Sequence, residues 1–172
     1  LLLLLKGNVL LFWAVVVMIG FIGGREYVRM VFPSILYEKD RIILSVIIAL
    51  PAAISLFTDR SGFSISIATV VPFGALICFV MYHYTRFERP LMIISRGLLG
   101  IVFIGLFGAH LVVIRSLPDG AHWLVILSAV TAGSDSCAYW VGSRWGKRKL
   151  CPNISPNKTV EGAVGGISGG IL

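Results

Sequence analysis

Long apolar stretches separated by short charged segments make up most of the chain. Residues 9–24, 42–57, 63–84, 91–114 and 122–142 are predominantly apolar, and a further apolar stretch begins near Gly162. The first two are short for a hydrocarbon layer about 30 Å thick, so we expect them to cross it with little tilt. Residues 1–5 resemble the tail of an earlier span. The pattern predicts an all-α, polytopic transmembrane helical bundle with about five full spans and partial spans at both ends.

Composition supports a membrane protein and disfavours a nucleic-acid-binding one. The chain is 57% hydrophobic and carries 15 Lys plus Arg against 8 Asp plus Glu, a net charge of +7. In a membrane chain such cations mainly set orientation and attract anionic head groups. We therefore expect membrane lipids and no nucleic acid as partners. The three cysteines lack metal-ligand spacing, so the sequence predicts neither a zinc site nor a disulfide framework.

The charges of alternate loops predict the orientation of the spans. One side has only Lys6, Arg60 and Arg115. The other side collects Arg25, Arg29, Lys39, Arg41, Arg86, Arg89, Arg144, Lys147, Arg148, Lys149 and Lys158, with Arg96 close by. Since cytoplasmic loops are the ones enriched in Lys and Arg, the richer side is predicted to be cytoplasmic.

Asp135 lies within an apolar stretch, where a carboxylate is costly. It belongs to a polar stripe at helical spacing, formed by Ser128, Thr131, Asp135, Tyr139 and Gly142. We expect this stripe to face a cavity rather than lipid. Asp135 is then either a functional carboxylate or a structural one that is hydrogen-bonded to a neighbouring helix.

A basic turn over residues 144–149 precedes a Ser-Pro-x-Lys-Thr-x-Glu-Gly segment. The turn is a membrane anchor, a clamp for phosphate or anionic lipid, or both. Ser155 and Pro156 resemble a helix N-cap and a first helical residue, and Thr159 is a second possible cap. The N-terminus of that helix would offer free amides to an anion, and Lys158 would add a charge.

Glycines recur at helical spacing after this segment. For these residues close helix packing is favoured over direct backbone contact with a ligand. They are Gly162, Gly165, Gly166, Gly169 and Gly170.

A run of these residues resembles the phosphatidate cytidylyltransferases, also called CDP-diacylglycerol synthases. The resemblance is strong over about thirty residues. They read Asp135-x-x-Ala138-Tyr139-x-x-Gly142, then Gly146-Lys147-x-x-Leu150-x-Pro152-x-Ile154-Ser155-Pro156-x-Lys158-Thr159-x-Glu161-Gly162, with Gly165-Gly166. The resemblance implies a nucleotidyltransferase of phospholipid biosynthesis, which makes CDP-diacylglycerol from CTP and phosphatidate and releases pyrophosphate with a divalent metal.

The resemblance also implies roles for single residues. Asp135 and Lys158 would be catalytic, and Asp135 would also be a ligand of Mg²⁺. Substrate binding would involve Lys147, Arg148, Ser155, Thr159, Glu161 and Gly162. Residues 1–133 would form the N-terminal transmembrane helices, and residues 134–172 the start of the catalytic region with its cytoplasmic loop.

An acidic signature of this family lies further downstream than any motif of this chain. We therefore expect the chain to be part of a longer protein, with further Mg²⁺ ligands beyond residue 172 and no activity of this part alone. We also expect a bacterial inner membrane protein with a cytoplasmic active site. Whether it forms a homodimer is left open. Two alternatives stay open as well, a transporter or channel subunit and a CTP-dependent kinase of isoprenoid alcohols.

Overall fold

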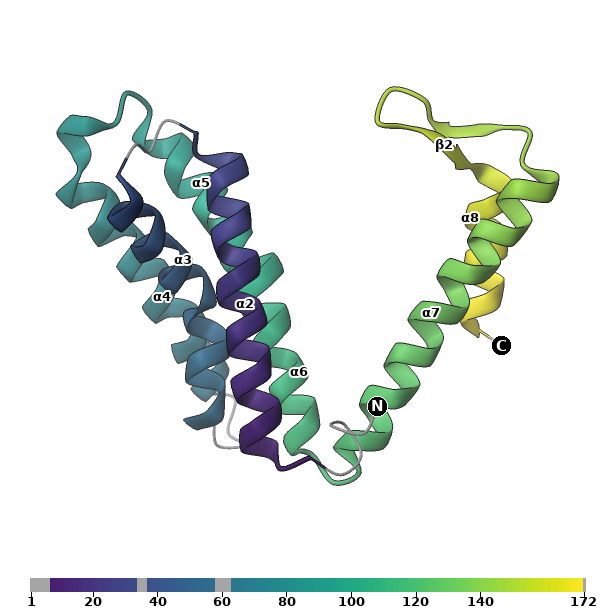
Figure 1. Ribbon diagram of the computed structural model, residues 1–172, viewed down its shortest axis with the longest axis horizontal. Helices are drawn as coiled ribbons and strands as arrows, with labels where there is room; N and C mark the ends of the chain where they lie inside the picture. Colours follow the sequence, from purple (N-terminus) through teal and green to yellow (C-terminus); the bar gives the residue numbers. More distant parts are fainter. Residues whose placement is uncertain (1–6, 34–36, 58–62, 172) are drawn as a thin grey trace. The chain divides into compact units, whose positions relative to one another are not determined.

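The computed structural model describes residues 7–33, 37–57 and 63–171, which are mostly helical (Figure 1). They form two compact units, Leu1–Gly120 and Ala121–Leu172, and each is described by itself. The sequence predicted a boundary between residues 133 and 134, which separates the N-terminal helices from the start of the catalytic region. This boundary lies inside helix α7 (Gly120–Trp145), which belongs almost entirely to the second unit. Residues 1–5, predicted to be the tail of an earlier span, lie outside the described residues.

The first unit consists of helices joined by short connections. Its elements are α2 (Val9–Val31), α3 (Glu38–Ile54), the 3₁₀ turn η1 (Ser55–Phe57), α4 (Phe63–Tyr82), the 3₁₀ turn η2 (Tyr84–Arg86), α5 (Pro90–Gly100), the π-helical segment η3 (Ile101–Leu106) and α6 (Phe107–Ser116). Helix α5, η3 and α6 follow one another without a break, so they form one apolar helix from Pro90 to Ser116.

The predicted membrane-type helices are confirmed. Among the described residues, the helices long and apolar enough to cross a membrane are Val9–Val31, Glu38–Phe57, Pro90–Ser116 and Gly120–Trp145, and Ser66–Tyr82 is a shorter apolar helix. The first two predicted spans were too short. Helix α2 continues for 23 residues to Val31 and α3 begins at Glu38, because charged residues can extend a helix into the head-group region.

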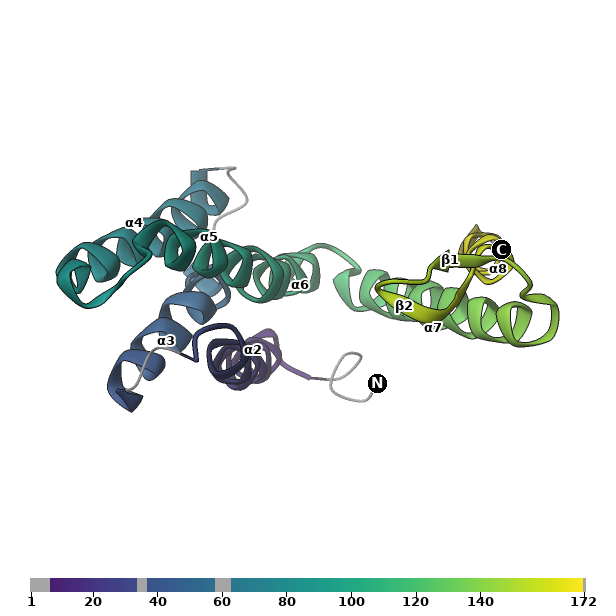
Figure 2. The ribbon, with the colours of Figure 1, turned by 90° about the horizontal axis from the view of Figure 1, so that it is seen from above.

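Helix α3 is the centre of the first unit, since it contacts α2, α4, η3 and α6. Figure 2 shows these helices from above. The core contains Val28, Phe32, Leu44, Ile47, Ile48, Leu76, Phe79, Val80, Ile93 and Ile101. Gly105 of η3 lies so close to α3 that an added Cβ would be 2.2 Å from the carbonyl oxygen of Ile48. A side chain at this position would separate the two helices.

The second unit joins two helices through a β-hairpin. Helix α7 (Gly120–Trp145) is followed by the antiparallel strands β1 (Lys149–Cys151) and β2 (Ser155–Thr159), and then by α8 (Val160–Ile171). Helix α8 lies alongside α7 in both views (Figures 1 and 2). The predicted helical, membrane-type bundle is confirmed, and the small two-stranded sheet is a local feature that the sequence did not predict.

Candidate active site

The residues expected to bind substrate lie in the hairpin and in the segments directly before and after it. Lys149 of β1 pairs with Thr159 of β2, and Cys151 pairs with Ser155, with an irregularity between the two pairs. The prediction that Ser155 caps a helix that starts at Pro156 is wrong, because both residues lie in β2. The residue before a proline prefers extended backbone, and a proline that donates no hydrogen bond is tolerated at the edge of a sheet.

Glu161 connects α8 to the basic turn. Its carboxylate accepts hydrogen bonds from the backbone N–H of Lys147 at 3.1 Å and of Arg148 at 3.2 Å. Hydrogen bonds hold the pKa of Glu161 below its ordinary value. The bond from its own N–H contributes most, partial burial opposes it, and the bonds from Arg148 and Lys147 lower the pKa further. The charged carboxylate therefore fixes the position of the turn.

The first amides of helix α8 already have acceptors in the residues before the helix. The N–H of Val160 donates to the carbonyl of Arg148 at 2.9 Å, and the N–H of Gly162 donates to Oγ1 of Thr159 at 3.2 Å. The N–H of Glu161 acts on its own carboxylate, whose pKa it lowers. Thr159 is thus the cap that the sequence predicted, but the expectation of free amides for an anion is wrong. An anion at this end would have to be held by cationic side chains.

Glycines bring the end of α7 and the start of α8 into close contact. A Cβ on Gly146 would lie 2.2 Å from the carbonyl oxygen of Gly142 and 2.7 Å from Oγ1 of Thr159. A Cβ on Gly162 would lie 2.9 Å from the carbonyl oxygen of Ala138. Thr159 and Gly162 are accordingly buried. The structure therefore places both residues in the contact between α7 and α8.

The same kind of contact continues along the two helices. A Cβ on Gly165 would lie 2.6 Å from the side chain of Val141, and one on Gly169 would lie 2.5 Å from Sγ of Cys137. The hydroxyl of Ser134 donates to the carbonyl of Gly166 at 2.9 Å. The prediction that the recurring glycines serve helix packing is confirmed.

Exposed cations gather on the hairpin. Lys147, Arg148, Lys149 and Lys158 are all exposed, and the sequence has no acidic residue between Gly146 and Val160. Lys158 is next to Thr159, the residue opposite Lys149, so both strands of the hairpin carry an exposed cation. Arg144 differs, because its guanidinium carbon lies 4.8 Å from the centroid of the Trp140 ring. The hairpin is thus a local region of positive charge.

Asp135 lies on an exposed side of α7 within its unit, as do Thr131 and Tyr139. It follows Ser134, which contacts α8, by one residue, or about 100° around the helix. The structure gives its carboxylate no hydrogen bond or ion pair with any described residue. Nor does the described chain bring three His, Cys, Asp or Glu side chains together as a metal site. Mg²⁺ is commonly bound through one or two carboxylates plus substrate phosphates. The chemistry of Asp135 fits the role of one such carboxylate ligand.

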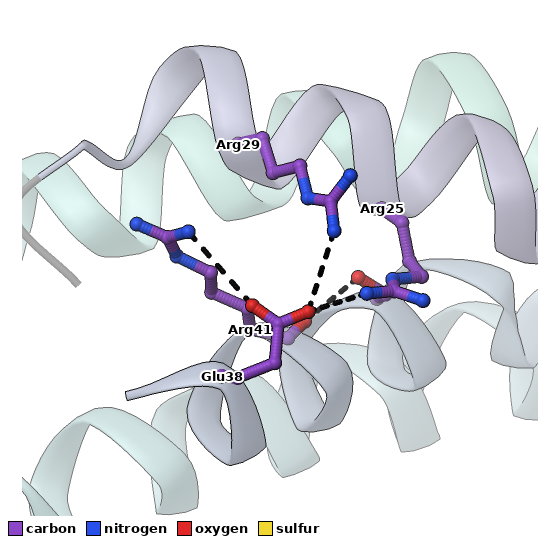
Figure 3. A network of polar contacts seen from close by, with 5 residues as sticks. Arg25, Arg29, Glu38 and Arg41 are labelled. Atoms are coloured by element: carbon purple, nitrogen blue, oxygen red, sulfur yellow. Dashed lines mark hydrogen bonds and ion pairs between the residues drawn. The ribbon is translucent and has the colours of Figure 1, made fainter. Parts of the chain in front are cut away.

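The structure also shows a polar cluster in the first unit that the sequence did not predict. Arg25 and Arg29 of α2 and Arg41 of α3 surround Glu38, and Figure 3 shows their side chains pointing toward its carboxylate. The signal in the sequence is weak. Arg25 and Arg29 are four residues apart on α2, and Glu38 and Arg41 are three apart on α3, so each pair lies on one helix face.

A second polar contact of this unit is buried. Nε2 of His83 lies 3.5 Å from Oδ1 of Asp40, and both side chains are almost fully buried. Nδ1 of His83 lies 3.1 Å from the carbonyl oxygen of Phe79. This contact joins the end of α4 to the start of α3, so it stabilises the same end of the unit as the arginines.

Comparison with known proteins identifies the family. A family model described as the cytidylyltransferase family matches residues 1–172. The chain belongs to the cytidylyltransferase family. This membership confirms the resemblance inferred from the residues between Asp135 and Gly166.

Relatives of this cytidylyltransferase chain are bacterial proteins named phosphatidate cytidylyltransferase. The one from Bacillus subtilis (strain 168) is 46% identical over 70 residues, which are 40% of this chain and 26% of that protein. The one from Staphylococcus saprophyticus is 37% identical over 92 residues, 52% of this chain and 35% of that protein. The one from Chlamydia pneumoniae is 31% identical over 132 residues, 70% of this chain and 43% of that protein. The chain thus spans less than half of the length of each of these relatives.

Proposed function

We propose that the protein containing this chain transfers the cytidylyl group of CTP to phosphatidate. A phosphate oxygen of phosphatidate attacks the α-phosphorus of CTP, the bond to the β-phosphate breaks, and CDP-diacylglycerol and pyrophosphate are formed. Membership of the cytidylyltransferase family and the names of the relatives support this reaction. The most specific support from the structure is the cationic hairpin that Glu161 holds in place.

A rigid group of cations suits a triphosphate. Lys147 and Arg148 are fixed through their own backbone N–H groups, so their side chains start from defined positions. Lys158 extends from the neighbouring strand. We assign these three cations to the phosphates of CTP or phosphatidate, with Lys158 stabilising the charge that develops in the transition state. Pre-positioned charges of this kind need little reorganisation during the reaction.

The other predicted site residues support the hairpin. Thr159 caps α8, Gly162 allows α8 to approach α7, and Glu161 holds the turn. Ser155 pairs with Cys151 at the far end of the hairpin, where its half-buried side chain is next to the loop. We therefore propose that Glu161, Thr159 and Gly162 act on substrate through the position of the cations.

Asp135 is proposed as a carboxylate ligand of Mg²⁺. When bound, the metal would neutralise phosphate charge during nucleotidyl transfer. Asp135 is suited to this role because it is exposed within its unit and no described residue engages its carboxylate.

We also propose that the protein spans the bacterial inner membrane with the hairpin on the cytoplasmic side. In the first unit the arginines near Glu38 lie at the opposite end of α2 from Arg115, whose guanidinium donates to the carbonyl of Gly7 at 2.8 Å. Single cysteines at Lys149 and Asp119, in a background without Cys78, Cys137 and Cys151, would test this. Reagents that do not cross membranes should label the two positions from opposite sides, and labelling of both from one side would contradict the orientation.

The position of a radioactive label separates this reaction from the alternatives. The natural-length protein in vesicles with phosphatidate should move the α-phosphate of CTP into lipid and release the β- and γ-phosphates as pyrophosphate. A kinase of isoprenoid alcohols would instead move the γ-phosphate into lipid. A transporter would move neither label into lipid, so either of these results would contradict the proposal.

A further inference from the structure

The arginine cluster of the first unit, defined by Arg25, Arg29 and Arg41 around Glu38, has no part in the proposed reaction. Arg29 Nη2 lies 3.5 Å from Oε1 of Glu38, Arg41 Nη1 lies 3.8 Å from Oε2, and Arg25 also bonds Oε1. These side chains come from two helices, α2 and α3, whose ends meet here. The cluster is therefore a feature of the packed unit and not of one helix face.

The charge of this cluster is unbalanced. Three guanidinium groups share one carboxylate. Two other acids are close by in the sequence, and of these Asp40 is buried beside His83 and Glu26 forms no ion pair with any described residue. The cluster thus keeps an excess of positive charge.

The arginines are also accessible. The relative solvent-accessible surface of the side chain is 35% for Arg25, 56% for Arg29, 26% for Arg41 and 49% for Glu38. A guanidinium group presents several donors in one plane, which suits the oxygens of a phosphate. Glu38 occupies only part of the donors of Arg25 and Arg29, so these two side chains have further donors for an anion.

The surface next to the cluster is apolar. Exposed Ile22 and Met30 lie on α2, and exposed Ile42 and Ile43 lie on α3. Both helices are candidate membrane spans. The arginines therefore lie where a phospholipid has its phosphate, and the apolar residues lie where it has its acyl chains.

We propose that the arginine cluster binds the phosphate of an anionic phospholipid, with a phosphomonoester preferred over a phosphodiester. The excess of two positive charges matches a phosphomonoester, which carries about −1.5 to −2 at neutral pH. A phosphodiester lipid has one charge fewer and one free oxygen fewer. This preference does not depend on the proposed transfer reaction, and phosphatidate is used below only as a phosphomonoester probe.

Spin-labelled lipids measure this preference directly. The chain is reconstituted in phosphatidylcholine vesicles, and electron spin resonance gives the association of labelled phosphatidate and phosphatidylglycerol relative to labelled phosphatidylcholine. Arg25→Gln with Arg29→Gln should lower the relative association of phosphatidate about fivefold, since charge-assisted hydrogen bonds are lost. The matched control is Arg86→Gln with Arg89→Gln, which removes the same charge from the same unit, and it should lower the association less than twofold.

Other results would overturn the proposal. An equal fall in both double variants would show a diffuse charge effect, and no fall in the first would show that the cluster binds no lipid. Displacement of labelled phosphatidate by millimolar inorganic phosphate or glycerol phosphate would show a site for soluble phosphate instead. Circular dichroism checks folding, and Arg29→Gln alone, which removes the most exposed arginine, should give a smaller fall of the same kind if the double variant does not fold.

Discussion

Glu161 shows how one side chain organises the candidate site. Its carboxylate holds two backbone N–H groups of the basic turn, and its own residue begins the helix that lies against α7. Because the folded pKa is lowered, the charged form stabilises the fold. This contribution is fully present above the ordinary pKa of 4.5 and is lost as pH falls through the lower folded value.

Acid should therefore release the turn. In NMR spectra of the detergent-solubilised chain, the amide proton signals of Lys147 and Arg148 should shift together, with a midpoint below pH 4.5. Glu161→Gln should remove this titration. A midpoint above 4.5, or a titration that persists in the variant, would show that another group controls the turn.

Asp135 tests the proposed metal site at the same scale. Asp135→Asn keeps the shape of the side chain, so the variant should fold, but the amide is a poorer Mg²⁺ ligand than a carboxylate. In the natural-length protein we expect the magnesium concentration for half-maximal transfer to rise about tenfold, from loss of about 1.4 kcal/mol of binding free energy. The measurement is CDP-lipid formation against magnesium, normalised to folded protein. Superimposable curves for the two proteins would contradict the assignment.

At the scale of elements, the contact between α7 and α8 determines where the hairpin lies. Small residues line this contact, and the space at each glycine differs. Gly165 faces Val141 with no room for a methyl group, whereas a Cβ on Gly170 would lie 3.6 Å from Cβ of Ser134, an ordinary contact. These two positions on one helix therefore form a matched pair.

Gly165→Ala should destabilise the second unit by about 1–3 kcal/mol, because an added methyl overpacks the contact. Gly170→Ala should be neutral or stabilising by up to about 1 kcal/mol, because alanine favours a helix. Hydrogen exchange of the α8 amides measures both effects. Equal protection in the two variants would show that α8 does not pack on α7 in this way.

At the scale of the whole molecule, the sequence predicted the spans because their length and apolar character reflect the thickness of a bilayer. It did not predict the hairpin, because its strands are short and its Ser-Pro and Asn residues are equally typical of a loop or cap. The α7–α8 contact was predictable, since glycines at helical spacing have few other uses in a membrane helix.

The polar contacts of the first unit show the limit of sequence reasoning. Arg25 and Glu38 lie on different helices, and Asp40 and His83 are 43 residues apart in the sequence. Such pairs depend on how the helices pack, and that register cannot be read from periodicity along one helix. The helix ends were also placed too early or too late, because charged residues were assigned to loops although α2 and α3 continue through them.

Lys158 tests most directly the claim that the cationic hairpin acts on phosphate during cytidylyl transfer. Lys158→Ala in the natural-length protein should lower transfer of the CTP α-phosphate into lipid about 100-fold, as expected for loss of one transition-state donor. Lys39→Ala removes a cation of the first unit and should leave the rate within twofold of wild type. With both variants normalised to folded, membrane-inserted protein, a wild-type rate for Lys158→Ala would contradict the account.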